Sequence, residues 1–359
     1  MKSMVQINIK TLEEFIIKIL KKNKVSEKDA RIVSDVLISA DKRGISSHGT
    51  ARLKRYVDHI AQGVILPDVS LEIIHETPVS YVVDGQGGLG QPVAYEMMNR
   101  CIEKASKNGM CFASIRNSNH YGIAGYYTKL ALKKDLIGIS STNSAPLVVP
   151  TFSKEAVIGT NPWSIGFPGS SQHFLLDMAT STVPRGKLEV YARSDASIPL
   201  VWATDENGLP TDNPKKVLEN VKIRAGGGLL PLGGGSEETG GHKGYGLSAM
   251  VDLLCGGLSM GSMGLKVYEK SNSPSGVCHF LGAIDPDVFC GRVQLKQQVD
   301  EYLFMLKNSG KASGRTTIFV AGEKEDFEEE KHDTTVPIQD TVFDTIKKLG
   351  EEYHLPLEL

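Results

Sequence analysis

Amphipathic helical patterns occupy both ends of the chain, and shorter β-branched runs lie between them. In about the first 65 residues, apolar residues recur at helical spacing behind three capping residues, Thr11, Ser26 and Ser47. Helical spacing returns at 292–308 and at 342–353. Because an amphipathic helix has to bury its apolar stripe, we expect the two ends to pack against each other.

The middle of the chain carries a different pattern. Four short runs bounded by Gly, Asn or Pro are typical of strands, at residues 79–84, 111–115, 136–142 and 173–179. A helical pattern separates the first two runs, and strands mixed with helices favour an α/β layer architecture. The sequence therefore predicts a helical domain from residues 1–70 and 300–359, with an α/β domain inserted at residues 71–299.

Segments of the second half give further expectations. The run 224–246 is so rich in glycine that it predicts a loop, because glycine loses much backbone entropy on ordering. The nearly all-apolar segment 247–258 predicts a buried helix. We expect one late strand at 317–323 and an acidic, solvated loop at 326–333.

Charge and composition exclude several partners. The 359-residue chain has a net charge of −2, so it lacks a global basic field that would attract nucleic acid or an anionic membrane. No apolar run reaches the roughly 18 residues of a membrane span, and the N-terminal segment does not resemble a signal peptide. The five cysteines are scattered without a CxxC pair, which favours reduced thiols in the cytoplasm and no metal site.

A glycine motif could suggest a dinucleotide fold. Gly85, Gly87 and Gly90 have the GxGxxG spacing, after a strand pattern and before a helical one. That fold needs an acidic residue at the end of the next strand to bond the ribose hydroxyls. The next strand ends instead in Arg116 and Asn117. We therefore interpret the motif as a tight strand-to-helix turn.

The segment 43–56, RGISSHGTARLKRY, offers an anion site. His48 and Arg52 are four residues apart, so on a helix they would share one face. A guanidinium grips a carboxylate with two prongs, and a helix start capped by Ser47 would add favourable potential. An exposed helix face with incidental charges is the alternative.

Two further groups could move or hold a proton. His120 lies among short amides in IRNSNHYGIAGYY, directly after an apolar strand pattern, and a neutral imidazole accepts a proton at physiological pH. Asp177 ends another apolar run, where a carboxylate could orient a histidine. Each also has a plain structural alternative, a hydrogen-bonded histidine and a turn carboxylate.

Two turns could receive a phosphate-bearing cofactor. TNSAP, with Ser144 at its centre, offers hydroxyl and amide groups that suit phosphate or ribose. GGHKGYG places Lys243 and free backbone N–H groups at a helix start, which forms an anion site. Taken alone, the first is an ordinary turn and the second a flexible loop.

These motifs together resemble the malate/L-lactate dehydrogenase family that lacks the Rossmann fold, most closely its archaeal-type malate dehydrogenase branch. The motifs occur in one order over nearly the whole length: RGISSHGTARLKRY, DGQGGLGQ, RNSNHYGIAGYY, TNSAPLVVPT, LLDMATS and HKGYGLS. The resemblance implies a homodimer, a helical domain built from both chain ends and a mixed α/β domain that binds NAD or NADP. It also accounts for the missing acidic residue after the glycine motif.

The resemblance implies roles for individual residues. His120 corresponds to the proton acceptor of one family member, and His48 with Asp177 to the acid pair of another. Arg52 corresponds to the clamp on the substrate carboxylate, beside Ser47 and His48. Cofactor contacts correspond to Ser144, Asp177, Met178, Ala179 and Lys243. We favour His120 as acceptor, with His48 polarising the substrate oxygen.

The expected reaction is hydride transfer between a nicotinamide cofactor and C2 of a small 2-hydroxy acid, with malate and oxaloacetate foremost. Lactate, sulfolactate and ureidoglycolate are alternatives, and so is the reduction of a cyclic imino acid on the same fold. A small-metabolite binder without catalytic activity is the alternative of another class. Arg185, Lys187 and Arg193 are candidates for holding the 2′-phosphate of NADP.

Overall fold

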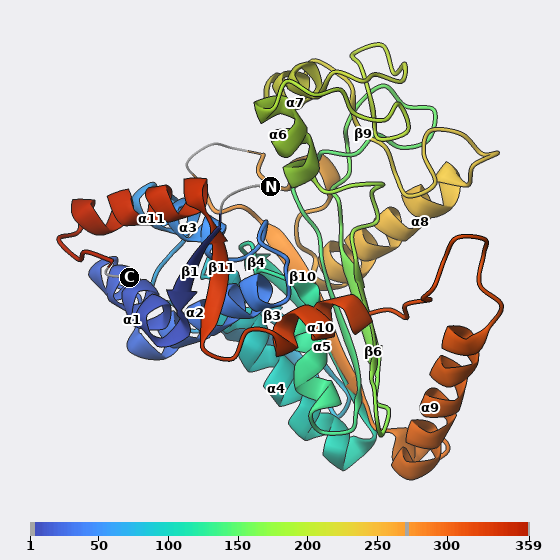
Figure 1. The fold of residues 1–359 in the computed structure, drawn as a ribbon. Helices are drawn as coiled ribbons and strands as arrows, with labels where there is room; N and C mark the ends of the chain where they lie inside the picture. Colours follow the sequence, from blue (N-terminus) through green and yellow to red (C-terminus); the bar gives the residue numbers. More distant parts are fainter. Residues whose placement is uncertain (1–3, 270–272, 358–359) are drawn as a thin grey trace.

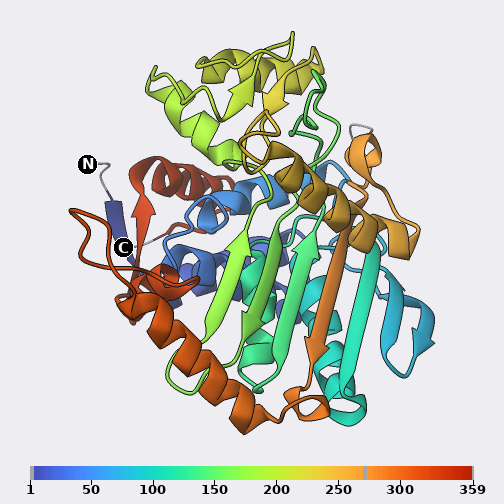
Figure 2. The same ribbon diagram turned by 90° about the vertical axis from the view of Figure 1, so that its right-hand side faces the viewer.

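The computed structural model describes residues 4–269 and 273–357, arranged around one seven-stranded sheet. The strand order is β2 (Glu72–Thr77), β3 (Ser80–Asp84), β4 (Met110–Ser118), β10 (Val277–Ile284), β5 (Ile137–Thr142), β6 (Trp163–Phe167) and β7 (Phe174–Met178). β3 and β4 are parallel, and the other neighbouring pairs are antiparallel. Figure 2 shows these strands side by side. The predicted α/β class with a mixed sheet is confirmed.

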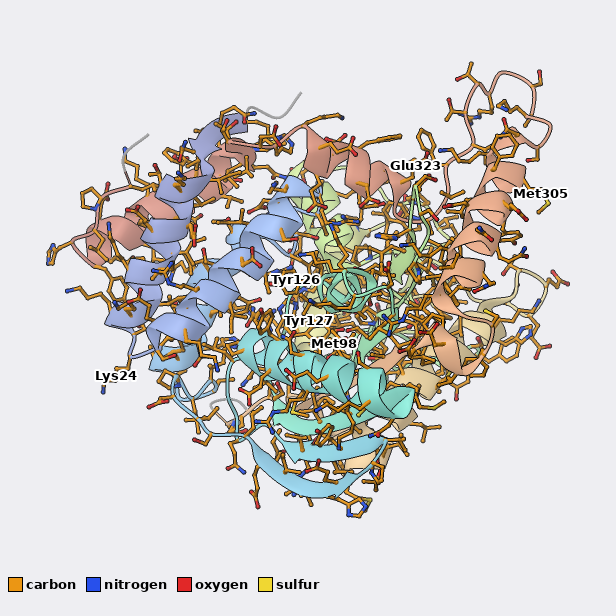
Figure 3. The ribbon with its side chains drawn as sticks, turned by 90° about the horizontal axis from the view of Figure 1, so that it is seen from below. Lys24, Met98, Tyr126, Tyr127, Met305 and Glu323 are labelled. Carbon is orange, nitrogen blue, oxygen red and sulfur yellow. The ribbon has the colours of Figure 1, made fainter. Side chains whose placement is uncertain are left out.

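Helices cover both faces of the sheet. α4 (Gly90–Asn108) and α5 (Ala124–Leu132) cover one face, where they pack on alternate strand residues such as Ala113 and Leu281. Figure 3 shows Met98 of α4 and Tyr126 and Tyr127 of α5 on this side. α8 (Gly241–Asp252) and the π-helical turn that follows it (Leu253–Gly257) pack on the other face, against residues such as Phe280. The pleat explains this division, because successive strand residues point to opposite faces.

The two ends of the chain pack together (Figure 1). β1 (Met4–Asn8) pairs with β11 (Thr335–Gln339). α1 (Ile9–Lys22), α2 (Glu27–Lys42), α3 (Leu53–Ala61) and α11 (Asp340–Glu352) share a second apolar core that includes Leu12, Leu37 and Leu349. This packing supports a helical domain built from both chain ends, whose boundaries remain a prediction, but the helix at residues 292–308 does not share this core.

Smaller elements complete the fold. α6 (Arg185–Arg193) and α7 (Pro214–Ile223), with the short strands β8 (Ala203–Thr204) and β9 (Gly228–Leu229), form a lobe with its own apolar cluster. α9 (Arg292–Asn308) stands at the opposite end of the molecule (Figure 1), and α10 (Glu323–Glu330) follows it in the chain. In the described part of the chain, no helix is both long and apolar enough to cross a bilayer.

Several local expectations are wrong. α1 begins at Ile9 behind the cap Asn8, rather than at Thr11. Residues 317–322 form no strand, and most of the expected acidic loop at 326–333 belongs to α10. The late strand is β11, which pairs with the chain's first strand. Edge pairing between distant segments leaves no local sequence signal, because only the partner satisfies the strand's hydrogen bonds.

The glycine-rich segment also differs in part. Most of 224–246 is loop, but α8 already begins at Gly241. The following apolar segment is helical, yet it is not fully buried: Leu253 is 61% exposed and Leu258 is 56% exposed.

His279 on β10 forms hydrogen bonds to both neighbouring strands, β4 and β5. Its buried ring predicts that the fold loses stability in acid. Its Nδ1 bonds the Thr142 hydroxyl and its Nε2 the Ser118 hydroxyl, both at 2.8 Å, and burial lowers its pKa to about 3. A histidine whose pKa falls on folding stabilises the fold above its unfolded pKa of about 6.5 and loses this contribution as the pH falls.

We expect the free energy of unfolding to drop by about 3 kcal/mol between pH 7 and pH 4 through His279 alone. Urea denaturation at both pH values measures it. His279→Gln removes this part of the pH dependence, whereas His75→Gln, at an exposed site on β2, retains it. An unchanged pH dependence in His279→Gln would contradict the assignment.

Candidate functional site

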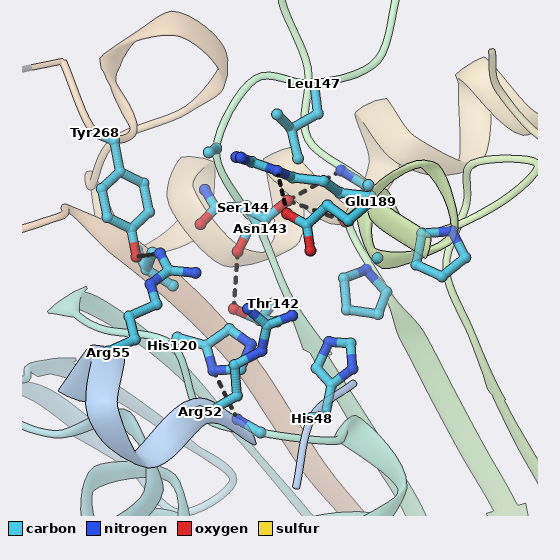
Figure 4. Close-up of a pocket in the computed structure, with 18 of the residues that line it drawn as sticks. His48, Arg52, Arg55, His120, Thr142, Asn143, Ser144, Leu147, Glu189 and Tyr268 are labelled. Carbon is cyan, nitrogen blue, oxygen red and sulfur yellow. Dashed lines mark hydrogen bonds and ion pairs between the residues drawn. The ribbon is translucent and has the colours of Figure 1, made fainter. Parts of the chain in front are cut away.

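A cavity of about 510 Å³ lies where β4, β5 and β10 meet the helical chain ends. Its lining brings together His48, Arg52 and His120, which the sequence analysis singled out in separate segments (Figure 4). Ser144 lines the same cavity. The structure therefore assembles the predicted proton-transfer and carboxylate-binding groups around one space.

The turn that carries His48 differs from the expected helix. Residues 46–49 form turns, a 3₁₀ segment spans Thr50–Arg52, and α3 begins only at Leu53. The expectation that Ser47 caps this helix is therefore wrong. The buried carboxylate of Asp41 holds the turn, since it accepts bonds from the Thr50 backbone at 2.8 Å and the Thr50 hydroxyl at 2.5 Å.

Ser47 orients both neighbouring functional groups instead of capping a helix. Its hydroxyl bonds His48 Nδ1 at 2.8 Å, and its carbonyl oxygen accepts a bond from Arg52 Nε at 2.6 Å. Within residues 4–269 and 273–357, the terminal nitrogens of Arg52 have no hydrogen-bond partner. Ser47 thus fixes the imidazole and the guanidinium from one residue.

His120 is held from the opposite wall. It lies on the loop between β4 and α5, and its Nδ1 bonds the hydroxyl of Tyr56, a buried residue of α3, at 2.7 Å. The backbone N–H of Gly122 lies 3.4 Å from the same nitrogen. The rings of His48 and His120 stack with centroids 5.5 Å apart and planes 23° apart. With both Nδ1 atoms engaged, the Nε2 atoms are the ring positions left for a ligand.

The glycine motif supports this loop and shows no sign of a phosphate cradle. Gly87 and Gly88 accept bonds from the Asn119 side chain, both at 2.9 Å. A Cβ at Gly90 would overlap the carbonyl oxygen of Asn119. Only glycine permits this close approach, so the motif acts as the tight turn that we expected and seats the residue before His120.

Burial keeps both histidines neutral at physiological pH. It lowers the pKa of His48 to about 4, with further lowering by the charges of Arg52 and Arg55. Burial also holds the pKa of His120 well below its usual value, with additional contributions from His48 and the two arginines. A neutral imidazole is suited to accept a proton at the ring nitrogen that carries no hydrogen.

Asp177 and Lys243 lie outside this lining. The Asp177 carboxylate accepts a bond from the Gly125 backbone at 2.7 Å, in the first turn of α5, and lines a second cavity of about 310 Å³. In the described part of the chain, no hydrogen bond or ion pair joins it to His48. Met178 ends β7 beside it and Ala179 follows. Lys243 is exposed in the first turn of α8.

The wall near Ser144 has groups that suit a nucleotide cofactor. The Ser144 hydroxyl lies 3.2 Å from that of Thr160, and its backbone N–H donates to the Asn161 side chain at 3.1 Å. Gly159 leaves no room for a Cβ beside this serine. Hydroxyl groups beside the apolar Leu147 fit a ribose and a flat ring, so this wall is compatible with a nicotinamide nucleoside.

Sequence reasoning missed three residues of the site. Tyr56 and Arg55 both lie in the quoted segment 43–56, in which the sequence indicated roles only for Ser47, His48 and Arg52. Tyr268 also lines the cavity, and its hydroxyl accepts a bond from Arg55 at 3.3 Å. Helical spacing alone could have placed Arg55 near Arg52, but no local pattern marks Tyr268.

Comparisons with known proteins agree with the geometry. The profile described as malate/L-lactate dehydrogenase matches residues 7–347. A malate dehydrogenase of Pyrococcus abyssi is 47% identical over 313 residues, which cover 87% of this chain and 85% of the relative. An L-sulfolactate dehydrogenase of Methanocaldococcus jannaschii is 38% identical over 349 residues, 96% of each chain. The crystal structure of malate dehydrogenase from Entamoeba histolytica aligns with a TM-score of 0.95 at 37% identity, over 99% of this chain and 100% of that one.

The packing of Gly49 predicts that the His48 turn tolerates no larger residue. A Cβ at this position would overlap the Asp41 carboxylate. We expect Gly49→Ala to lower the free energy of unfolding by about 1–3 kcal/mol, because overpacking forces the turn to shift. Urea denaturation measures the loss. Gly310→Ala, where an added Cβ meets nothing within 4 Å, is the control, and equal stability of both variants would refute the packing argument.

Proposed function

Because the chain belongs to the malate/L-lactate dehydrogenase family, we propose that it interconverts malate and oxaloacetate, with hydride transfer at C2. The observation that carries this proposal is the convergence on one cavity of two neutral histidines and an arginine that pairs with no carboxylate among the described residues. A bound nicotinamide cofactor would accept or supply the hydride. The chain's own residues bind the carboxylate, orient C2 and move the proton.

Arg52 binds the carboxylate next to the reacting carbon. Its Nε is occupied by the Ser47 carbonyl, so the terminal nitrogens point their donors at the ligand. A guanidinium held in this way grips a carboxylate and fixes the direction of the C1–C2 bond. Fixing this bond decides which hydrogen of the substrate faces the cofactor wall, and such positioning is a large part of catalysis.

His120 moves the proton of the hydroxyl group. In oxidation, the neutral tautomer that donates from Nδ1–H to the Tyr56 oxygen accepts the hydroxyl proton at Nε2, and the same Tyr56 oxygen stabilises the resulting imidazolium. In reduction, the protonated ring returns this proton to the developing alkoxide. His48 stacks on His120 and donates from its own Nε2–H to the substrate oxygen. In this neutral form, the Nδ1 of His48 accepts from the Ser47 hydroxyl, and only a charged His48 would donate from Nδ1 to Ser47.

The cofactor contacts are proposed for the wall around Ser144, with Asp177, Met178, Ala179 and Lys243 farther along its path. Either NAD or NADP is compatible with this assignment. Of the three cations considered for a 2′-phosphate, Arg185 lines the cavity, and its Nε donates to Glu189 at 2.9 Å. Asp177 accepts a hydrogen bond from the backbone at the start of α5, and this bond stabilises the short loop between His120 and that helix.

A homodimer in the cytoplasm is the proposed working form. Large apolar side chains stay exposed on two helical surfaces: Val293, Tyr302, Phe304 and Met305 on α9, with Leu247, Leu253, Leu258 and Met260 on and after α8. Figure 3 shows Met305 pointing away from the body of the chain. A second copy would cover such surfaces. The described cysteines are free thiols, as expected in a reducing compartment.

Initial rates with purified protein test the proposed function. The panel is oxaloacetate, pyruvate, sulfopyruvate and piperideine-2-carboxylate, each with NADH and with NADPH. Clear turnover of oxaloacetate supports the proposal and identifies the coenzyme. Turnover of the cyclic imine with silence on every oxo acid would overturn it in favour of an imine reductase, and silence throughout would favour a binding protein.

Replacing His120 should remove the proton acceptor without removing the fold. We expect His120→Gln to lower kcat for malate oxidation by about 100-fold or more, the usual contribution of general acid–base catalysis. His48→Gln should cost less, because it polarises the oxygen without taking the proton. His75→Gln is the surface control. If His48→Gln lost more activity than His120→Gln, the two roles would have to be exchanged.

The pH profile of malate oxidation follows from the lowered pKa of His120. A base whose pKa lies well below 6.5 stays neutral, and therefore active, from pH 8 down to pH 6.5. We expect kcat/KM to stay nearly constant over this range, because this ratio reports the free enzyme. A tenfold fall per pH unit that begins above pH 6.5 would contradict the assignment.

A further inference from the structure

Arg55 is a second cationic group of the cavity that the reaction described above does not use. It lies in the first turn of α3, and its Nη2 donates to the Tyr268 hydroxyl at 3.3 Å. Its guanidinium carbon lies 5.8 Å from the centroid of the same ring. Within residues 4–269 and 273–357, neither Arg55 nor Arg52 forms an ion pair with a carboxylate. Both charges therefore face the cavity unneutralised.

The charge of the whole lining fits a doubly charged ligand. Three arginines and one glutamate line the cavity: Arg52, Arg55, Arg185 and Glu189. Arg185 already bonds Glu189, so the pair is neutral. The three histidines of the lining, His48, His59 and His120, are neutral as well, because burial lowers their pKa values. Two positive charges remain, on Arg52 and Arg55. Enclosed charges are costly unless a partner neutralises them, and a ligand with two anionic groups would do so.

The positions of Arg52 and Arg55 allow them to bind different ends of one ligand. They are three residues apart, so they lie on neighbouring parts of one helical surface. In Figure 4, Arg55 and Tyr268 lie on one side of Arg52 and His48 lies on the other. A ligand whose C1 carboxylate binds Arg52 and whose C2 oxygen faces the histidines has its far end free to extend toward Arg55.

We infer that Arg55, held by Tyr268, is the subsite for the distal anionic group of the substrate. It selects dianionic 2-oxo and 2-hydroxy acids, with a carboxylate or sulfonate at the far end, over monoanions such as pyruvate. Tyr268 is a positioning residue that keeps the guanidinium turned into the cavity. The inference rests on the proposed function for the identity of the reacting end.

Kinetics of Arg55→Met, Arg55→Lys and Lys54→Met test this subsite. Lys54 neighbours Arg55 in the chain and pairs with Asp58, so its variant changes the charge of α3 without changing the lining. We expect Arg55→Met to lower kcat/KM for oxaloacetate and sulfopyruvate by about 10- to 100-fold, as for a lost charged hydrogen bond. The value for pyruvate should stay within about threefold, Arg55→Lys should recover part of the loss, and Lys54→Met should match the unmodified protein.

Oxaloacetate and sulfopyruvate also distinguish which anionic group the subsite prefers. A larger loss with oxaloacetate than with sulfopyruvate identifies a subsite for a planar carboxylate, and the reverse identifies one for a tetrahedral sulfonate. Equal loss of all three substrates, pyruvate included, would overturn the inference, because Arg55 would then serve the common reacting end. Unchanged values for all three would overturn it as well.

Calorimetric binding of L-malate and L-lactate to the protein without cofactor separates this inference from the proposed function. We expect malate to bind the unmodified protein more tightly than lactate, and Arg55→Met to remove the difference. If no oxo acid were turned over but this difference remained, the proposed function would fail while the subsite stood. Equal affinities for malate and lactate in the unmodified protein would overturn the subsite.

Discussion

The site depends on one hydrogen bond between two parts of the chain that fold around separate cores. Tyr56 belongs to the core of the chain ends, and His120 follows a strand of the central sheet. The bond between Tyr56 and His120 fixes the imidazole at the wall of the cavity. The ring of His48, which stacks on that of His120, belongs to the same N-terminal part of the chain as Tyr56. The proposed proton acceptor His120 and its partner Tyr56 therefore come together only when both cores are formed and docked.

Electrostatics explain which groups of the cavity remain charged. The histidines give up their protons on burial, so the arginines of α3 and its 3₁₀ entry are the charged groups left open to the ligand. Neutral bases beside free guanidiniums are suited to bind an anion and then take its proton. The same burial would make an uncharged cavity poor at binding small acids, since nothing would offset their desolvation.

The sequence was most informative where the chemistry lies close together in the chain. His48 and Arg52 were found from one segment, and His120 from another, and the cavity contains all three. The glycine motif was correctly interpreted as a turn because an expected acidic residue was missing. The local form of the His48 turn could not be predicted, because Ser47 looks like a helix cap while the buried Asp41 holds the turn from α2.

Features made by distant segments were the ones that the sequence did not indicate. The central strand β10 was not among the expected strands although its run VCHFLGAI is mostly apolar, and the pairing of β10 and of β1 with β11 is set by partners far along the chain. Tyr268 reaches the site from a loop more than 200 residues beyond Arg55. Asp177 looked like a partner for a histidine, but its partner is the backbone of α5.

A crystal structure with the reduced cofactor and tartronate, a dicarboxylate whose hydroxyl carbon cannot accept a hydride, tests whether His120 faces the substrate hydroxyl. We expect one carboxylate on Arg52 and the hydroxyl oxygen within hydrogen-bond distance of His120 Nε2. A hydroxyl bonded to His48 alone, or tartronate seated beside Asp177 in the second cavity, would contradict it.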